Sequence, residues 1–155
     1  RRQRQMCIRD SNKEERFSLY LGYLTHMLTD EKFILEIHPY VLQRIAVTGY
    51  DRDNPQTYVK FGRDVDQIDF RLVKEFPGID KAYQALCQVT PYEIADYITE
   101  QELTASREWI KNYFFETEHT IEDPIFLPYQ EMYQFIPEAV AQICDRLPEY
   151  ITSGV

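Results

Sequence analysis

The hydrophobic residues of this chain recur at the spacing of an α-helix, and no stretch alternates for long at the spacing of a β-strand. The clearest case follows Pro55, a residue that suits the first position of a helix. Steps of three and four residues then separate Tyr58, Phe61, Val65, Ile68 and Leu72. This pattern predicts a helix with one buried stripe, and the Pro77-Gly78 pair should end it.

Helical spacing also marks both ends of the chain. Apolar residues cover most of the circumference of the helix predicted over 13–29, so we expect that helix to be central. Asp30 could end it or cap a second segment over 31–46, which Pro39 should kink or divide. The last helix is expected over 129–147, with an interruption at Pro137.

Shorter helices are predicted between these segments. One should run over 80–89. Thr90 and Glu93, and then Thr99 and Glu102, have the spacing of a capping box, in which a threonine and a glutamate satisfy the first amides of a helix. Two such boxes so close together predict two consecutive short helices. Loops are expected at 49–55 and 118–128.

The fold class that follows is all-α, with residues 12–155 as a single-domain helical bundle. A chain of 155 residues has the size of one domain, and it shows neither an internal repeat nor a domain boundary. Residues 1–11 are expected to be a non-native or disordered extension, because they contain four arginines and share no periodicity with the rest. Residues 5–10 resemble the translated end of a transposon used to build sequencing libraries, which would imply a metagenomic reading frame without its native N-terminus.

Charge excludes some partners and favours others. The formal net charge is −9, and no cluster of lysine and arginine alternates with aromatic residues, so nucleic acid is not an expected partner. An anionic substrate would need a local cation, such as a bound metal ion, to offset the negative field. No apolar run is long enough for a transmembrane segment or resembles a secretory signal, and three scattered cysteines indicate no disulfide framework. We therefore expect a soluble protein, with a weak indication of the cytoplasm.

Gly22, His26 and Asp30 are the most informative candidates for a site. They are four residues apart, so on a helix they lie along one stripe. An imidazole and a carboxylate are both good zinc ligands, and a glycine one turn earlier leaves room for an ion or another helix. The spacing is equally compatible with a histidine at the rim of the core and an aspartate that ends the helix.

A second group of acidic residues comprises Asp64, Asp66 and Asp69, and Gly62 precedes Asp66 by one turn. Asp69 has apolar neighbours in sequence, so its carboxylate needs a cation, a hydrogen-bond network or a raised pKa. Two carboxylates near a metal could also position water as a general base. Alternatively, Arg63 and Arg71 pair with these aspartates on a solvated face. His38 is a further possible metal ligand, whereas His119 reads as a loop residue.

The stretch FSLYLGYLTHMLTD over 17–30 resembles the G-x-x-x-H-x-x-x-D helix of the zinc-dependent phospholipase C family. The segment GRDVDQIDF over 62–70 is similar to bacterial members of that family. The resemblance covers roughly residues 15–115 and implies an all-helical fold shared with zinc-dependent single-strand nucleases, with His26 and Asp30 as zinc ligands. The family's earlier N-terminal ligands and its later H-x-x-x-E helix have no match here, and His38 or the aspartates of 64–69 are candidates to replace the latter.

These observations predict metal-dependent phosphoester hydrolysis. Zinc would be held by His26 and Asp30, with His38 as a further candidate ligand, and would lower the pKa of bound water. Asp66 or Asp69 would act as general base or orient a ligand. The substrate would be a phosphoester or a phospholipid, and the residues present would make an incomplete enzyme. The rival hypothesis is a non-catalytic helical interaction module, whose acidic surface docks a basic partner as an inhibitor or immunity protein does.

Overall fold

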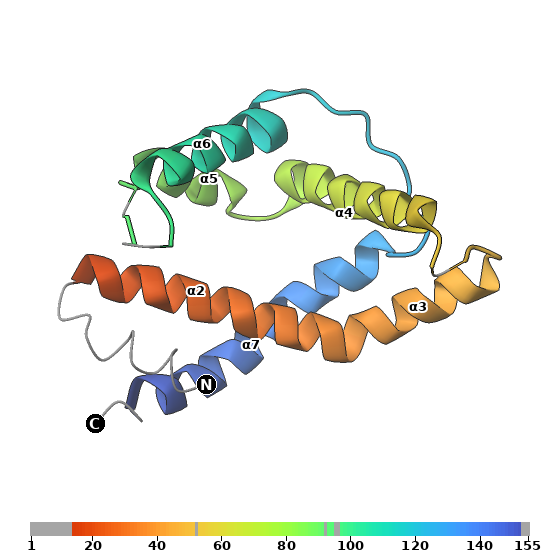
Figure 1. Ribbon diagram of the computed structural model, residues 1–155, viewed down its shortest axis with the longest axis horizontal. Coiled ribbons are helices and arrows are strands. Elements are labelled where there is room, and N and C mark those ends of the chain that lie inside the picture. Colours follow the sequence, from red (N-terminus) through yellow and green to blue (C-terminus); the bar gives the residue numbers. More distant parts are fainter. Residues whose placement is uncertain (1–13, 52, 92, 95–96, 153–155) are drawn as a thin grey trace. The chain divides into compact units, whose positions relative to one another are not determined.

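The computed structural model describes residues 14–51, 53–91, 93–94 and 97–152 (Figure 1). Helices account for most of these residues, which confirms the all-α prediction. The α-helices are α2 (Glu14–Lys32), α3 (His38–Val47), α4 (Pro55–Glu75), α5 (Ile79–Gln88), α6 (Glu100–Ile110) and α7 (Tyr129–Thr152). Two π-helices extend this set, η1 (Phe33–Ile37) and η2 (Lys111–Glu116).

The helices belong to two compact units. The first unit contains α2, η1, α3 and most of α7, and the second is formed by residues 53–132, with α4, α5, α6 and η2. That residues 12–155 make a single domain stays a prediction.

In the first unit, α2, η1 and α3 form one continuous helical rod (Figure 1). Asp30 therefore neither ends the helix nor caps a following segment, so both expectations for that residue were wrong. Pro39 does not break the rod, but the rod is not a regular α-helix there, because the turn before Pro39 widens into the π-helix η1. There the His38 amide donates to the Phe33 carbonyl, five residues back. A π segment is one way for a helix to accommodate a proline, which has no amide hydrogen to donate.

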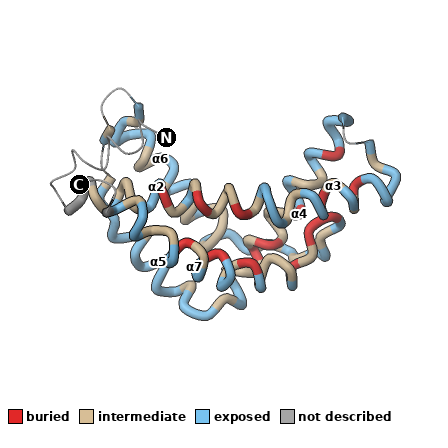
Figure 2. The backbone as a smooth tube through the Cα atoms, turned by 90° about the horizontal axis from the view of Figure 1, so that it is seen from below, coloured by how far each residue is buried: buried red, intermediate tan, exposed pale blue. Residues whose placement is uncertain are grey.

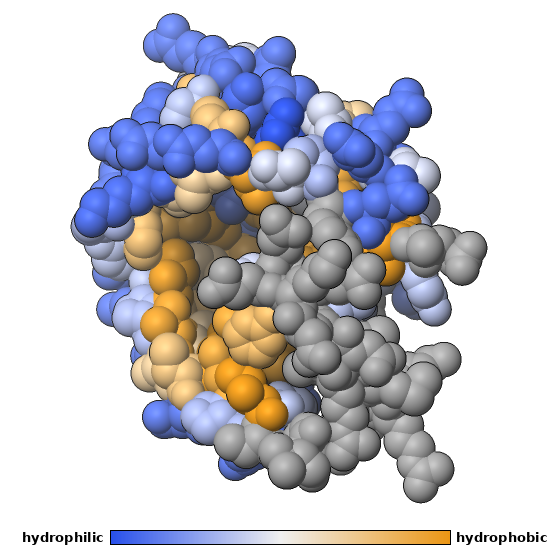
Figure 3. Space-filling model, turned by 90° about the vertical axis from the view of Figure 1, so that its left-hand side faces the viewer, coloured by the Kyte–Doolittle hydropathy of each residue, from blue (hydrophilic) through white to orange (hydrophobic). Residues whose placement is uncertain are grey.

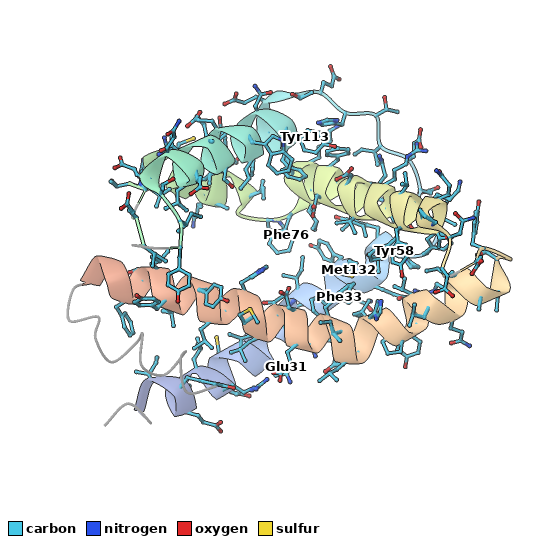
Figure 4. The ribbon with its side chains drawn as sticks, in the orientation of Figure 1. Glu31, Phe33, Tyr58, Phe76, Tyr113 and Met132 are labelled. Carbon is cyan, nitrogen blue, oxygen red and sulfur yellow. The ribbon has the colours of Figure 1, made fainter. Side chains whose placement is uncertain are left out.

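Helix α7 packs on this rod through an aromatic contact and an ion pair. The rings of Phe33 and Phe135 meet edge to face with centroids 6.1 Å apart, and Arg146 pairs with Glu31 (Figure 4). The buried residues of this unit come from all three long helices (Figure 2), and the apolar ones are Leu24, Leu28, Val41, Ile45, Phe135, Ala139 and Ile143. The interruption predicted at Pro137 was wrong, because α7 continues through it while residues on both sides remain buried.

In the second unit, α4 begins and ends as its sequence predicts. The Asn54 side chain accepts a hydrogen bond from the Gln56 amide at 2.9 Å, and Pro55 takes the first helical position. The helix ends before Gly78, whose φ of 87° is a conformation that favours glycine. The buried face differs from the predicted stripe, because Tyr58 is 61% exposed while Asp64 is 3% exposed.

Only one of the two predicted capping boxes begins a helix. At Thr99 the box is complete, since its hydroxyl accepts from the Glu102 amide and the Glu102 carboxylate accepts from the Thr99 amide. The helix predicted after Thr90 was wrong for the described residues there. Instead, Ile94 and Ile98 exchange both backbone hydrogen bonds in an isolated bridge, which uses the amides that a helix would have needed.

The surface mixes hydrophilic side chains with exposed hydrophobic ones, as one face shows in Figure 3. The most exposed large hydrophobic residues include Leu35, Val47 and Tyr97. Among the described residues, no helix combines the length and the apolar character needed to cross a membrane.

Candidate functional site

His26 and Asp30 lie one turn apart on α2 and come together at the surface. The distance from His26 Nε2 to Asp30 Oδ2 is 3.4 Å, and the two side chains are 69% and 49% exposed. The helix places them so because residues four apart share a face. The convergence expected from the sequence is therefore present, and both side chains are accessible from solvent.

Gly22 lies one turn before this pair, and its own Cα position is exposed. A Cβ built on Gly22 would meet no described atom within 4 Å. Neither another helix nor a side chain of the described residues therefore explains the glycine. As far as the described residues go, the space around the Gly22 Cβ position is open.

The separation of His26 and Asp30 fits a shared zinc ion. Two ligand atoms about 2.0 to 2.1 Å from a tetrahedral zinc are about 3.3 Å apart, and the observed separation is 3.4 Å. The same separation also fits an ordinary ion pair between a protonated imidazole and a carboxylate. The two ligand types and their spacing are thus compatible with two positions of a zinc site, but they do not require that a zinc ion binds.

His38 does not join this pair. It is half-buried at the start of α3, eight residues beyond Asp30 on the same helical rod. With a rise of about 1.5 Å per residue in an α-helix, that is roughly 12 Å along the axis, too far for one ion. Among the described residues, no three histidine, cysteine, aspartate or glutamate side chains are grouped closely enough to hold a metal. The role of His38 as a ligand stays a prediction.

The predicted catalytic aspartates belong to the second unit, one turn apart on α4. Burial raises the pKa of Asp69 from 3.8 to about 6, and the neighbouring charge of Asp66 adds to the effect. For a carboxylate on this apolar side, the sequence left three possibilities, a nearby cation, a hydrogen-bond network or a raised pKa. The structure favours the raised pKa. A carboxylate with a pKa close to neutral can accept a proton near physiological pH.

Asp66 and His119 are linked through η2. The Tyr113 hydroxyl donates to Asp66 Oδ2 at 3.3 Å, and Tyr113 points from η2 toward α4 (Figure 4). His119 stacks on Phe70 with centroids 3.7 Å apart, and its Nε2 donates to the Tyr113 carbonyl at 2.6 Å. His119 thus holds the loop against α4 and η2, which agrees with its interpretation as a loop residue.

Asp64 has a different role from its two neighbours. Its buried carboxylate accepts hydrogen bonds from three consecutive backbone amides, those of Ile125, Phe126 and Leu127. It therefore fixes the loop that leads into α7. Sequence reasoning missed this role, although one signal was available, because Asp64 lies one turn before the buried Ile68 and shares its face.

The alternative that Arg63 and Arg71 neutralise the three aspartates was wrong. Arg63 pairs with Glu122 at 3.3 Å, and Arg71 pairs with Glu75 at 3.1 Å. The guanidinium of Arg71 also lies 4.2 Å from the ring centroid of Tyr129. Both arginines have long side chains that reach a neighbouring element or the next helical turn, so they pair with glutamates rather than with the three aspartates.

Comparison with known proteins gives no match to this chain among protein-family models, curated sequences or solved structures. The likeness to the zinc-dependent phospholipase C family therefore remains an expectation that rests on the residues quoted for it.

Proposed function

We propose that this protein takes part in metal-dependent phosphoester hydrolysis, with His26 and Asp30 as zinc ligands. The observation that carries the proposal is the 3.4 Å separation of His26 Nε2 and Asp30 Oδ2 on an accessible helix face. An imidazole nitrogen and a carboxylate oxygen at this spacing supply two ligands of a tetrahedral ion. The open space beside Gly22 leaves room for the ion and a phosphate.

When bound, zinc would lower the pKa of a coordinated water and offset the negative charge of a phosphoester. Such a local cation matters for a chain with a net charge of −9, which otherwise repels phosphate. His26 and Asp30 would hold the ion in place. Asp69 belongs to the other unit, and its pKa of about 6 suits a group that accepts a proton near neutral pH. The zinc site itself therefore rests on His26 and Asp30 alone.

Zinc affinity is the direct test, measured by competition with a fluorescent chelator. A catalytic zinc ordinarily has three protein ligands, whereas the described residues bring together two, so we expect weak binding by this chain. His26→Ala and Asp30→Asn should each lower the affinity by roughly ten-fold or more, since removing a direct ligand costs at least as much as removing its supporting partner.

Two matched variants serve as controls. His38→Gln removes a histidine from the same rod, and Glu138→Gln removes an exposed carboxylate from α7, and neither should change zinc affinity. Unchanged affinity in His26→Ala would contradict the metal site. A loss in His38→Gln equal to that in His26→Ala would place the ion elsewhere.

Activity tests the function separately from the site. We expect little hydrolysis of bis(4-nitrophenyl) phosphate by this chain with zinc, because the ligand set is incomplete. His26→Ala should abolish whatever zinc-dependent hydrolysis the chain has. Zinc binding that depends on His26 and Asp30 without any zinc-dependent hydrolysis would contradict the proposed function while leaving the metal site intact.

A further inference from the structure

The negative charge of this protein is concentrated in one of its two units. Residues 53–132 contain 16 aspartates and glutamates and 7 lysines and arginines, a net charge of −9. The remaining residues contain 10 of each kind, a net charge of zero. The second unit therefore accounts for the whole net charge of the chain.

Within this unit, α6 presents a face that carries an aromatic residue among acidic ones. The exposed residues on it recur at steps of three and four, and they are Gln101, Glu102, Ala105, Glu108 and Trp109. Trp109 is 56% exposed. An exposed tryptophan in such a setting is typical of a protein interaction surface, because its large ring can anchor a partner.

Two aromatic rings of η2 hold the indole of Trp109 in place. It stacks on the Tyr113 ring with centroids 5.2 Å apart and an angle of 11°, and it meets Phe114 edge to face. A ring fixed in this way loses little conformational entropy when a partner binds. Its exposed part is thus a preformed platform.

The cations near this face are already paired. Arg107 lies 3.0 Å and Lys111 lies 2.8 Å from the carboxylate of Glu108. The Arg107 guanidinium also donates to the Val89 carbonyl at 2.8 Å. Glu102 keeps its negative charge, since hydrogen bonds from the Thr99 backbone and hydroxyl lower its pKa. Glu108 is therefore already neutralised by two cations of its own chain, and the negative charge that this face offers beside the indole comes from Glu102.

We propose that the outward face of α6, with Trp109 at one end and Glu102 two turns earlier, docks an arginine-rich segment of a partner protein. One guanidinium of such a segment can stack on the indole while another pairs with a carboxylate. Charge complementarity selects this partner, because the acidic unit attracts a basic segment and repels nucleic acids and anionic membranes. The inference goes beyond the proposed hydrolysis and does not depend on the zinc site.

A fluorescein-labelled deca-arginine peptide is the probe. Its fluorescence anisotropy measures binding to the whole chain. Trp109 is the sole tryptophan of the sequence, so its intrinsic emission reports whether the peptide reaches this face. We expect the emission of Trp109 to change at the same peptide concentrations that raise the anisotropy, and deca-lysine to bind more weakly.

Variants locate the surface. Trp109→Ala should weaken binding roughly two- to five-fold, as expected for an exposed cation–π contact. Trp109→Phe, which keeps an aromatic ring over Tyr113, should lose less. Glu102→Gln keeps the capping box but removes a charge, and it should weaken binding roughly two-fold. Circular dichroism and melting temperatures verify that each variant is folded.

Glu138→Gln on α7 is the matched control, because it removes the same charge from the first unit. It should leave the affinity for deca-arginine unchanged. An equal loss in Glu138→Gln and Glu102→Gln would show attraction by net charge alone and overturn the proposal. So would the absence of peptide binding at low salt, binding without any change in Trp109 emission, or unchanged affinity in Trp109→Ala.

Discussion

At the scale of the residue, three aspartates on α4 have three different environments. Asp64 accepts hydrogen bonds from three backbone amides. Asp66 accepts one from the Tyr113 hydroxyl. Asp69 has a pKa raised mainly by burial. Similar carboxylates in one short segment thus serve as an anchor, a hydrogen-bond partner and a candidate base, and their surroundings decide among these roles.

Asp69→Asn should change the pH dependence of stability. The unfolded aspartate releases its proton near pH 3.8 and the folded one near pH 6. Between these values the folded state binds more protons, so the contribution of Asp69 to stability falls as the pH rises. Asparagine resembles the protonated acid and should remove this fall.

Urea unfolding at several pH values measures the effect. The variant and the wild type should be equally stable near pH 4. At pH 7 the variant should be more stable by about 1 to 2 kcal/mol, a value discounted for the solvent that still screens a partly exposed carboxylate. Asp145→Asn, an exposed aspartate on α7, should show no such trend. A stability difference that is the same at both pH values would contradict the raised pKa.

At the scale of the element, prolines inside the helices disrupt them less than the low helix propensity of proline predicts. Pro39 follows a π segment within a continuous rod, and Pro137 lies inside α7. An interior proline removes one hydrogen bond and crowds the preceding turn. Buried neighbours such as Phe135 and Ala139 offset this cost, because they keep α7 packed on both sides of Pro137.

Pro137→Ala should therefore stabilise the protein. Alanine restores a backbone amide that can donate to the carbonyl four residues earlier and removes the steric conflict of the ring. We expect the free energy of unfolding to rise by about 1 kcal/mol, less than the full helix penalty because the unfolded chain also gains freedom.

Pro55→Ala is the control for this change. Pro55 occupies the first helical position, where an amide has no partner within the helix, so alanine should bring no gain there. Both variants are compared with the wild type by urea unfolding. A loss of stability in Pro137→Ala would show that the ring itself contributes packing.

At the scale of the whole molecule, charge is unevenly divided. The unit of residues 53–132 carries the entire net charge of −9, while the rest is neutral. Excess charge of one sign destabilises a compact state through self-repulsion, and salt screens it over about 8 to 10 Å at ordinary ionic strength. Repulsion among the exposed glutamates of the second unit should therefore limit the stability of the chain.

Sodium chloride should accordingly raise the free energy of unfolding of the whole protein. The expected gain appears between low and moderate ionic strength, where screening changes most. Urea unfolding at increasing salt concentration measures it. A fall in stability with salt would instead show that ion pairs such as Arg146–Glu31 and Arg71–Glu75 outweigh the repulsion.

The sequence by itself determined the local features of this protein. Helical periodicity predicted the long helices, Asn54-Pro55 and Pro77-Gly78 marked the ends of α4, and Thr99 began α6 with its capping box. The spacing of His26 and Asp30 also predicted their convergence, because four residues make about one turn of any helix. These features depend on contacts between residues close in sequence, and such contacts can be read from spacing.

Tertiary structure alone decided what depends on distant residues. After Thr90, the bridge between Ile94 and Ile98 forms instead of the helix that the capping pattern predicted. At Pro137, burial of neighbouring residues keeps α7 continuous where a break was predicted. The anchor at Asp64 needs amides more than sixty residues away. The raised pKa of Asp69 depends on burial. Hydrogen bonding and desolvation act through space, so identical residue types acquire different roles only when the chain has folded around them.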